Sequence, residues 1–175
     1  MIKEFFKPQT VAEAVKLKEK YKDEAVYMAG GTDVNCRASK YEIEKVIGIE
    51  QLKLNKISKT YEALSIGAGV TIQKLIDSPT VPDQLTIAAG HFMNRNIRNM
   101  ATIGGNIASN HTTSNLIPIL IALDAELNLA GSGPSVSVYD FITQEMSDLI
   151  ESITISSENL KNPYGLRKFS HTAND

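Results

Sequence analysis

The sequence predicts a mixed fold of the α+β class, and two features of the chain support this prediction. The hydrophobic period changes several times along the chain, from the 3.6-residue repeat of amphipathic helices to the two-residue alternation of half-buried strands. The composition, 42% hydrophobic and 22% charged residues in a chain of 175, is that of an ordinary globular protein with one or two small domains. No internal repeat or low-complexity segment points to a repeat architecture instead.

The N-terminal elements follow from local patterns. Residues 10–21, "TVAEAVKLKEKY", predict a helix with Thr10 as N-cap, Glu13 at the capping-box position and the apolar residues on one face. "EAVYMAG" predicts a short buried strand that runs into a glycine pair, and "YEIEKVIGI" predicts another strand. "ALSIGAGVT" predicts a third, followed by a helix at 71–77 that stops before proline, and a longer helix is expected at 83–95.

The remaining elements are a helix and three strands. "SNLIPILIALDAEL" predicts a helix with Pro118 in its first turn, where proline is tolerated. "AELNLA" and "PSVSV" alternate like two strands around the turn "GSG", and "LIESITIS" alternates like a further strand. The polar stretch 51–60 has no strong period and is the expected boundary between a small N-terminal unit and a larger second unit.

Charge and cysteine content exclude several classes of function. A net charge of −2 leaves no electrostatic footprint for nucleic acid or for an anionic membrane surface. The chain lacks a long apolar stretch and the apolar core of a signal peptide, so a cytoplasmic protein is expected. Cys36 alone cannot form an internal disulfide or hold an iron–sulfur cluster. The three histidines have no metal-ligand spacing, and His111 is expected to be a solvated loop residue, so no metal site is predicted.

Two glycine pairs, in "MAGGTDV" (28–34) and "MATIGGNIASN" (100–110), leave bare backbone between apolar segments. Glycine lets backbone amides approach an anion and accepts positive φ, and Thr32 adds a hydroxyl donor to the first loop. Two such loops suit the two phosphates of an extended dinucleotide. Neither loop has the spacing of a known nucleotide signature, and a glycine pair is also an ordinary turn between elements. The residues alone leave both interpretations open.

Four ordered motifs, "AGGTDV" (29–34), "LSIGAGVTIQKL" (64–75), "NIRNMATIGGNIA" (96–108) and "SNLIPILIALDAEL" (114–127), resemble the FAD-binding medium subunit of molybdenum hydroxylases of the xanthine dehydrogenase and carbon monoxide dehydrogenase type. The resemblance extends from "FFKPQTVAEAV" to "LRKFS". It implies a two-lobed FAD-binding domain of the vanillyl-alcohol-oxidase-like (PCMH) type, with FAD between the lobes. The implied regions are lobes at 1–55 and 56–160 and the start of a C-terminal domain at 161–175, with the rest of that domain missing.

The resemblance also assigns site residues. The first glycine loop would wrap the pyrophosphate, and the second would face the pyrophosphate and the ribityl chain. Phe92 and Met93 would touch the cofactor from the preceding helix, Leu149 and Ile150 would pack near it, and Arg167 would stabilise negative charge on the reduced flavin ring. No catalytic side chain is assigned. The implied cofactor-binding residues are Ala29, Gly30, Gly31, Thr32, Asp33, Val34, Phe92, Met93, Ala101, Thr102, Gly104, Gly105, Asn106, Ser114, Asn115, Leu149, Ile150 and Arg167.

Ordinary structural roles remain open for several of these residues. Phe92 and the other apolar members of the set are typical of a protein core, and Asp33 is typical of a turn that bonds its own backbone. Arg95 and Arg98 could form an anion-binding or partner-contact patch, but a solvated helix face is the expectation.

The chain departs from the family pattern after the second glycine pair. It has His111-Thr112 where relatives have Ser-Pro, and Ser114-Asn115 where they have Ser-Asp. Asn115 keeps the hydrogen-bonding shape of aspartate without its charge.

The function that the resemblance implies is electron transfer. FAD would take electrons from a small [2Fe-2S] partner subunit, beside a large molybdopterin-binding subunit, and pass them to NAD or another acceptor. The single cysteine fits this division, because the cluster must reside in another chain. The alternative is a non-catalytic scaffold or assembly protein of the same fold that binds FAD weakly or not at all.

Overall fold

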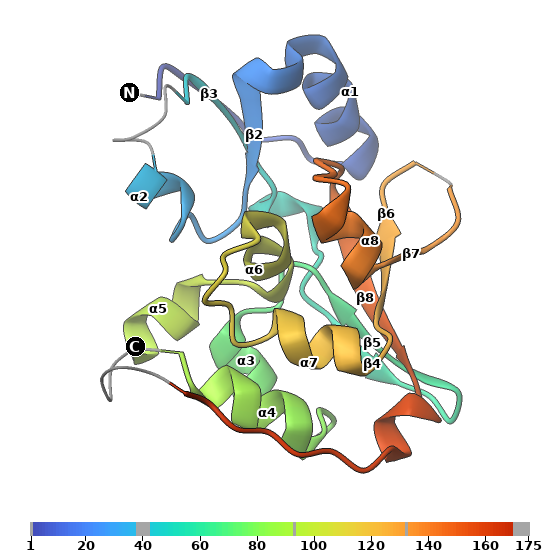
Figure 1. Cartoon of the computed structure of the whole chain (residues 1–175). Helices are drawn as coiled ribbons and strands as arrows, with labels where there is room; N and C mark the ends of the chain where they lie inside the picture. Colours follow the sequence, from blue (N-terminus) through green and yellow to red (C-terminus); the bar gives the residue numbers. More distant parts are fainter. Residues whose placement is uncertain (1, 38–42, 93, 132, 170–175) are drawn as a thin grey trace.

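The computed structural model describes residues 2–37, 43–92, 94–131 and 133–169, and it contains two sheets with helices packed around them (Figure 1). The predicted mixture of helices and strands is confirmed. The small sheet is parallel, in the order β1 (Glu4–Phe6), β3 (Lys45–Gly48), β2 (Ala25–Met28). The large sheet is antiparallel, in the order β4 (Ile57–Lys59), β5 (Ala63–Gly67), β8 (Ile150–Ser156), β6 (Glu126–Leu129), β7 (Val136–Ser137).

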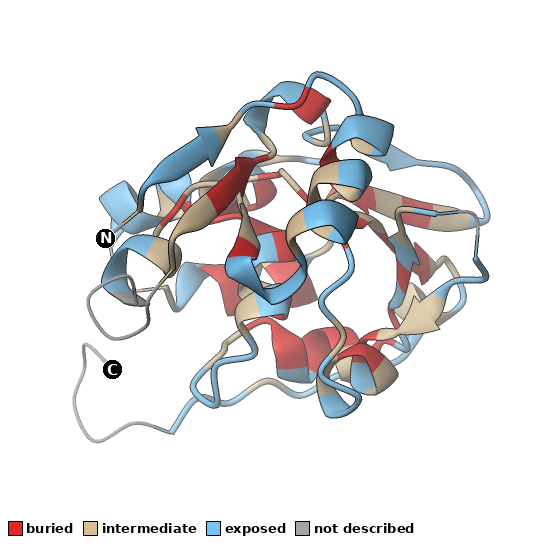
Figure 2. Ribbon diagram, turned by 90° about the horizontal axis from the view of Figure 1, so that it is seen from above, coloured by how far each residue is buried: buried red, intermediate tan, exposed pale blue. Residues whose placement is uncertain are grey.

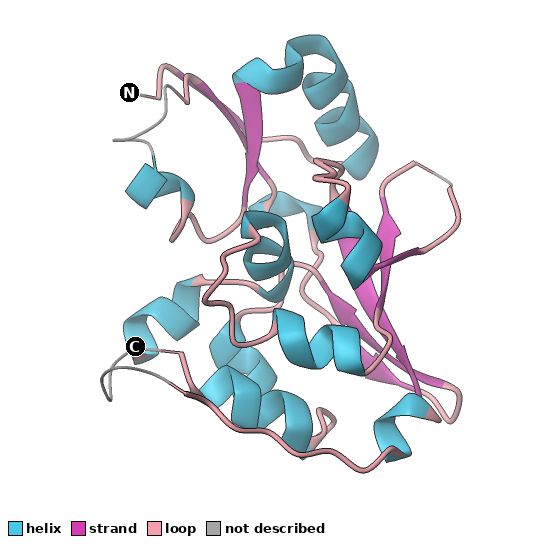
Figure 3. Ribbon diagram, viewed as in Figure 1, coloured by secondary structure: helices cyan, strands magenta, loops and turns pink. Residues whose placement is uncertain are grey.

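The helices connect these strands and cover them. Helices α3, α4, α6 and α7 lie together on one side of the large sheet (Figure 3). The α-helices are α1 (Val11–Tyr21), α2 (Val34–Arg37), α3 (Ile72–Asp77), α4 (Asp83–Gly90), α5 (Arg95–Met100), α6 (Ile103–Ser109), α7 (Ile117–Ala122) and α8 (Val138–Thr143). Three 3₁₀ turns, η1 (Lys22–Glu24), η2 (Glu50–Leu52) and η3 (Asn159–Lys161), complete the described elements.

The N-terminal unit, from β1 to η2, is a parallel sheet with α1 packed against it. Thr10 caps α1 as predicted, because its Oγ1 accepts the Glu13 amide at 3.2 Å. The Glu13 carboxylate accepts the amide of Gln9 at 2.8 Å, one residue before the partner of a standard capping box. The buried cluster of this unit contains Ala14, Ala25, Ile47, Leu52 and Leu149, so it includes one residue from the far end of the chain.

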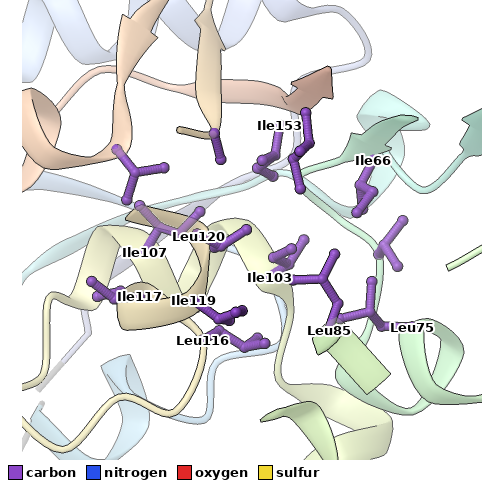
Figure 4. Packing of buried hydrophobic residues seen from close by; sticks show 14 of the residues in the cluster. Ile66, Leu75, Leu85, Ile103, Ile107, Leu116, Ile117, Ile119, Leu120 and Ile153 are labelled. Carbon is purple, nitrogen blue, oxygen red and sulfur yellow. The ribbon is translucent and has the colours of Figure 1, made fainter. Parts of the chain in front are cut away.

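The C-terminal unit, from β4 to η3, holds the larger core. The alternation predicted in β5 and β8 places Leu64 opposite Ile155 and Ile66 opposite Ile153 in the antiparallel ladder. Figure 4 shows side chains of α3, α4, α6 and α7 meeting this face of the sheet, and Figure 2 shows that the buried residues gather in the interior, between the sheet and the helices. Pro118 lies in the first turn of α7, as predicted.

Two predicted elements differ from the structure. The helix expected at 83–95 ends at Gly90, and a second helix, α5, begins at Arg95. Asn94 adopts an extended conformation, and its Oδ1 caps α5 by accepting the Ile97 amide at 2.9 Å. The strand expected in "PSVSV" is shortened to β7, because Ser137 caps α8 by accepting the Asp140 amide at 2.9 Å. In both cases a polar side chain caps a new helix at a point where the apolar pattern predicted that the preceding element would continue.

The chain after β8 follows the outer side of α4. Gln84, which is buried, donates from Nε2 to the Leu160 carbonyl at 3.1 Å and ties η3 to α4. Residues 162–169 have no regular element and run back toward α5 (Figure 1). The expected lobe boundaries at 55 and 160 and the start of a further domain at 161 stay predictions, and residues 170–175 lie outside the described part.

Candidate functional site

A cleft of about 210 Å³ lies between the two units. The N-terminal unit contributes β2, the residue after it and α1, and the C-terminal unit contributes α6, α8 and the start of β8. Most of the wall on the α6 side is made of very small residues, which leave the backbone open to a ligand. Five residues of the predicted site line this cleft: Ala29, Gly104, Gly105, Leu149 and Ile150.

The second glycine pair lies in the first turn of α6, so its prediction as a loop is wrong. Gly104 is buried, and a Cβ there would lie 2.6 Å from the Cβ of Ala68 and 2.9 Å from its carbonyl oxygen. Packing of α6 against the chain after β5 therefore requires this glycine. Gly105 is exposed and lines the cleft, and the nearest protein atom to an added Cβ would be the Thr102 hydroxyl oxygen at 2.9 Å.

The first amides of α6 are already used by the protein. Thr102, buried with Ala101 at the junction of α5 and α6, is the N-cap. The amides of residues 103–106 donate, at 2.9 to 3.1 Å, to the carbonyls of Val70, Ala68 and Thr102 and to the Thr102 hydroxyl. The second glycine pair thus offers a ligand close approach to the backbone, while its amides stabilise the fold.

The first glycine pair differs from the second in that no acceptor among the described residues uses its backbone amides. A Cβ on Gly30 would lie 1.7 Å from the Met100 carbonyl oxygen, so this glycine holds the segment against the entry to α6. Gly31 has a φ of +68°, which favours glycine. Within the described part of the chain, the amides of Gly30, Gly31 and Thr32 have no hydrogen-bond acceptor. Val34 starts α2, so these amides lie in a turn between β2 and α2 in which Gly31 is buried and Gly30 and Thr32 are partly exposed. Converging amides in such a turn can receive an anion.

Several predicted polar residues bond to one another. Asp33 Oδ1 lies 2.6 Å from His111 Nε2, so His111 is more than the solvated residue expected from the sequence. Ser114 Oγ donates to Asn106 Oδ1 at 2.7 Å and accepts the amides of Leu116 and Ile117, just before and at the start of α7, at 3.3 and 3.2 Å. Asn115 Nδ2 donates to the carbonyl before α5, that of His91, at 3.4 Å. These hydrogen bonds link the α6–α7 connection to α6, to the end of α4 and to the first glycine segment.

The other predicted residues lie away from the cleft lining. Phe92 packs against the large core, and its carbonyl accepts the Arg98 guanidinium at 3.1 Å. Arg98 also donates to Gln73 Oε1 at 3.0 Å, so the expected solvated helix face is wrong at this position. Arg167 is exposed on the C-terminal segment, and Met93 lies outside the described residues.

Tyr27 is one of the cleft residues that the sequence analysis did not predict. Burial raises the pKa of its phenol to about 12, with smaller contributions from the charges of Asp148 and Glu19. The phenol is therefore protonated at neutral pH and can donate a hydrogen bond into the cleft. Alternation along β2 places Tyr27 and Ala29 on the same side of the chain, and this was the available signal.

The described residues contain no group of three or more histidine, cysteine, aspartate or glutamate side chains that could hold a metal ion. Within the same ranges, no helix is long and apolar enough to cross a membrane.

Comparison with known proteins assigns the family. Residues 1–156 match the family described as "FAD binding domain in molybdopterin dehydrogenase". The chain belongs to this family. The resemblance noted from the four motifs is thereby confirmed, FAD is the cofactor of the family, and the family consists of oxidoreductase components.

The relatives include proteins of named and unnamed activity. The chain is 38% identical over 164 residues to the uncharacterized protein YgfM of Escherichia coli K12, covering 94% of this chain and 61% of that protein. It is 33% identical over 135 residues to the nicotinate dehydrogenase FAD-subunit of Eubacterium barkeri, covering 72% of this chain and 45% of the relative. The chain therefore spans less than two thirds of the length of these relatives.

The solved structures establish the fold. Carbon monoxide dehydrogenase from Hydrogenophaga pseudoflava superposes with a TM-score of 0.87 at 24% identity, covering 100% of this chain and 66% of that chain. Quinoline 2-oxidoreductase from Pseudomonas putida 86 superposes with a TM-score of 0.81 at 21% identity, over 89% of this chain and 59% of that chain. The predicted fold class, that of the FAD-binding domain, is confirmed.

Proposed function

We propose that the cleft between the two units binds FAD and that the chain is the FAD-containing electron-transfer component of a molybdenum hydroxylase. The observation that carries this proposal is the cleft wall at Ala29 and Gly105, where a larger side chain would enter the cleft, close in sequence to the amides of Gly30 and Gly31, which no acceptor in the described chain uses. Bound FAD would supply reversible hydride and single-electron chemistry, which no protein side chain provides.

The two glycine pairs have different tasks in this proposal. The amides of Gly30, Gly31 and Thr32 hydrogen-bond the anionic part of the cofactor, because no protein acceptor in the described chain uses them. Gly105 lets the cofactor lie against α6 without a side chain between them. The residues thus divide the work into anion binding at one segment and close approach at the other.

The rest of the cleft orients the cofactor and excludes water. Phe141, Met146 and Leu149 form an apolar wall opposite β2. Tyr27 keeps its proton and donates a hydrogen bond from the other wall. An apolar pocket with a few placed polar groups is typical of a site for a ring-containing cofactor.

As an electron-transfer component, the chain needs partners that supply and accept electrons. Electrons arrive from a [2Fe-2S] subunit associated with a molybdopterin-binding subunit and leave to NAD or another acceptor. Cys36 is the single cysteine of the chain, so the cluster belongs to another chain. A lone thiol also suits the reducing cytoplasm, where we place the protein. Residues 1–55 and 56–160 act as the two lobes that hold FAD between them.

The proposed FAD site is tested by comparing the FAD affinity of the wild type with that of the Gly105→Val variant. The full chain is titrated with FAD, and binding is followed by flavin absorbance and fluorescence. The variant should lose at least about tenfold in affinity, equivalent to about 1.4 kcal/mol, because a branched side chain occupies the cleft wall. Gly165→Val is the matched control, since nothing lies within 4 Å of an added Cβ there. Equal binding by Gly105→Val and wild type would overturn the site, and a folded wild type without flavin affinity would favour the scaffold function.

A further inference from the structure

We infer that His111 is a positioning residue for the cofactor, acting through Asp33 at the end of the first glycine segment. This inference rests on the proposed FAD site and adds a residue that the family motifs do not assign. His111 Nε2 lies 2.6 Å from Asp33 Oδ1, and the two side chains come from different units of the fold. The contact therefore links the anion-binding segment of the N-terminal unit to the α6–α7 connection.

The turn that carries His111 is anchored on both sides. Asn110 ends α6 in the left-handed conformation, with φ 44°, and its Nδ2 donates to the Ile142 carbonyl of α8 at 3.2 Å. Ser114 bonds Asn106 of α6, and its own amide donates to the His111 carbonyl at 2.9 Å. His111 thus projects from a turn that is fixed to α6 and α8, which is what a side chain needs in order to position another.

Asp33, the partner of His111, is also held in a fixed position by its neighbours. Asp33 follows Gly30, whose close approach to Met100 leaves no room for a Cβ, and Gly31, whose positive φ directs the chain into α2. The Asp33 side chain is 29% exposed, so water only partly screens its charge. A shift of this carboxylate would move the amides that immediately precede it.

Charge explains why the position of this carboxylate matters. FAD carries a negatively charged pyrophosphate, and the proposed site places it against the amides just before Asp33. A carboxylate near that anion repels it, since like charges in a partly buried site interact strongly. An imidazole N–H that donates to Asp33 compensates this charge and turns the carboxylate toward the α6–α7 connection. His111 therefore makes the first glycine segment more favourable for an anion without touching the anion.

Affinity measurements on the full chain test this role. His111→Ala should raise the dissociation constant for FAD roughly tenfold, because one hydrogen bond to a charged group is lost. His111→Gln should recover most of the affinity, since its Nε2 amide can donate to Asp33. Asp33→Asn combined with His111→Ala should also recover affinity, because the repelling charge is gone. His91→Ala is the matched control, since the hydrogen bonds described for His91 use its backbone amide and carbonyl.

Salt separates an electrostatic effect from a general loss of structure. Raising the ionic strength from about 0.01 M to about 1 M shortens the Debye length from about 30 Å to about 3 Å, so the deficit of His111→Ala should shrink. Thermal unfolding of each variant without FAD is measured in parallel. Unchanged FAD affinity in His111→Ala, or no recovery in the double variant, overturns the role of His111. Failure of the wild type to bind FAD overturns the proposed function, and this inference with it.

Discussion

Gly30→Ala is the substitution whose effect the structure specifies most directly. The added Cβ would lie 1.7 Å from the Met100 carbonyl oxygen and 2.5 Å from the carbonyl carbon. Ordinary contact begins near 3.4 Å, so the two backbone segments would have to separate by about 1.7 Å. Overpacking of this kind costs about 1–3 kcal/mol, and the upper end applies because the obstacle is backbone that cannot rotate away.

The expected result is a melting temperature lower by roughly 6–12 °C, from about 3 kcal/mol in a chain of this size. Thermal and urea unfolding, followed by circular dichroism, measure the change. Gly90→Ala is the control, because Gly90 is the last residue of α4 and an added Cβ meets nothing within 4 Å. It should gain about 0.5–1 kcal/mol, since alanine restricts the unfolded chain. A Gly30→Ala protein as stable as wild type would refute the close approach between the two segments.

Three further changes have defined outcomes. Asn94→Ala removes the N-cap of α5 and should cost about 1 kcal/mol in urea unfolding; an unchanged midpoint would contradict the capping role. Glu145→Gly should stabilise the protein by up to about 1 kcal/mol, because Glu145 has a φ of 52°; a lower melting temperature would argue against strain there. Tyr27 has a folded pKa of about 12 against 10 unfolded, so its contribution to stability is present below pH 10 and lost between pH 10 and 12. Tyr27→Phe should flatten the profile of stability against pH between pH 10 and 12 and remove a tyrosinate absorbance step near pH 12. An absorbance step that persists in the variant would assign the raised pKa to another tyrosine.

Local signals in the sequence were sufficient for much of the fold. The apolar alternation of β5 and β8 and the cap at Thr10 depend on neighbouring residues, and all are found as predicted. The break between α4 and α5 was missed because Phe92 continues the apolar pattern of α4. Asn94 carried the contrary signal, since asparagine is a strong N-cap.

The second glycine pair shows why local propensity was insufficient. Two adjacent glycines disfavour a helix, so a loop was the natural prediction. Gly104 is helical because Ala68, thirty-six positions earlier, packs against it and accepts its amide, and Thr102 caps the same turn. The tertiary contact outweighs the propensity, and no nearby residue reveals it.

Long-range pairing also limited the prediction of the site. The resemblance to the family identified five residues of the cleft wall, and three of them, Ala29, Gly104 and Gly105, lie within the short motifs that carry it. The contact between Asp33 and His111 joins residues 78 positions apart, and it depends on how α2 and the α6–α7 connection meet in space. Tyr27 was missed for a similar reason, since its environment is set by Asp148 and by burial under the opposite unit.

Leu149 connects the packing of the fold to the geometry of the cleft. It belongs to the C-terminal unit by sequence, lies 3% exposed in the core cluster of the N-terminal unit, and lines the cleft at its inner end. Its carbonyl accepts the Ala130 amide at 2.8 Å, which ties it to the strand next to β8. Separating the two units would expose this side chain to water, so opening the cleft is opposed by the hydrophobic effect. A cleft held at fixed width by the core presents its apolar wall before any ligand arrives, and this reduces the free-energy cost of ordering the site on binding.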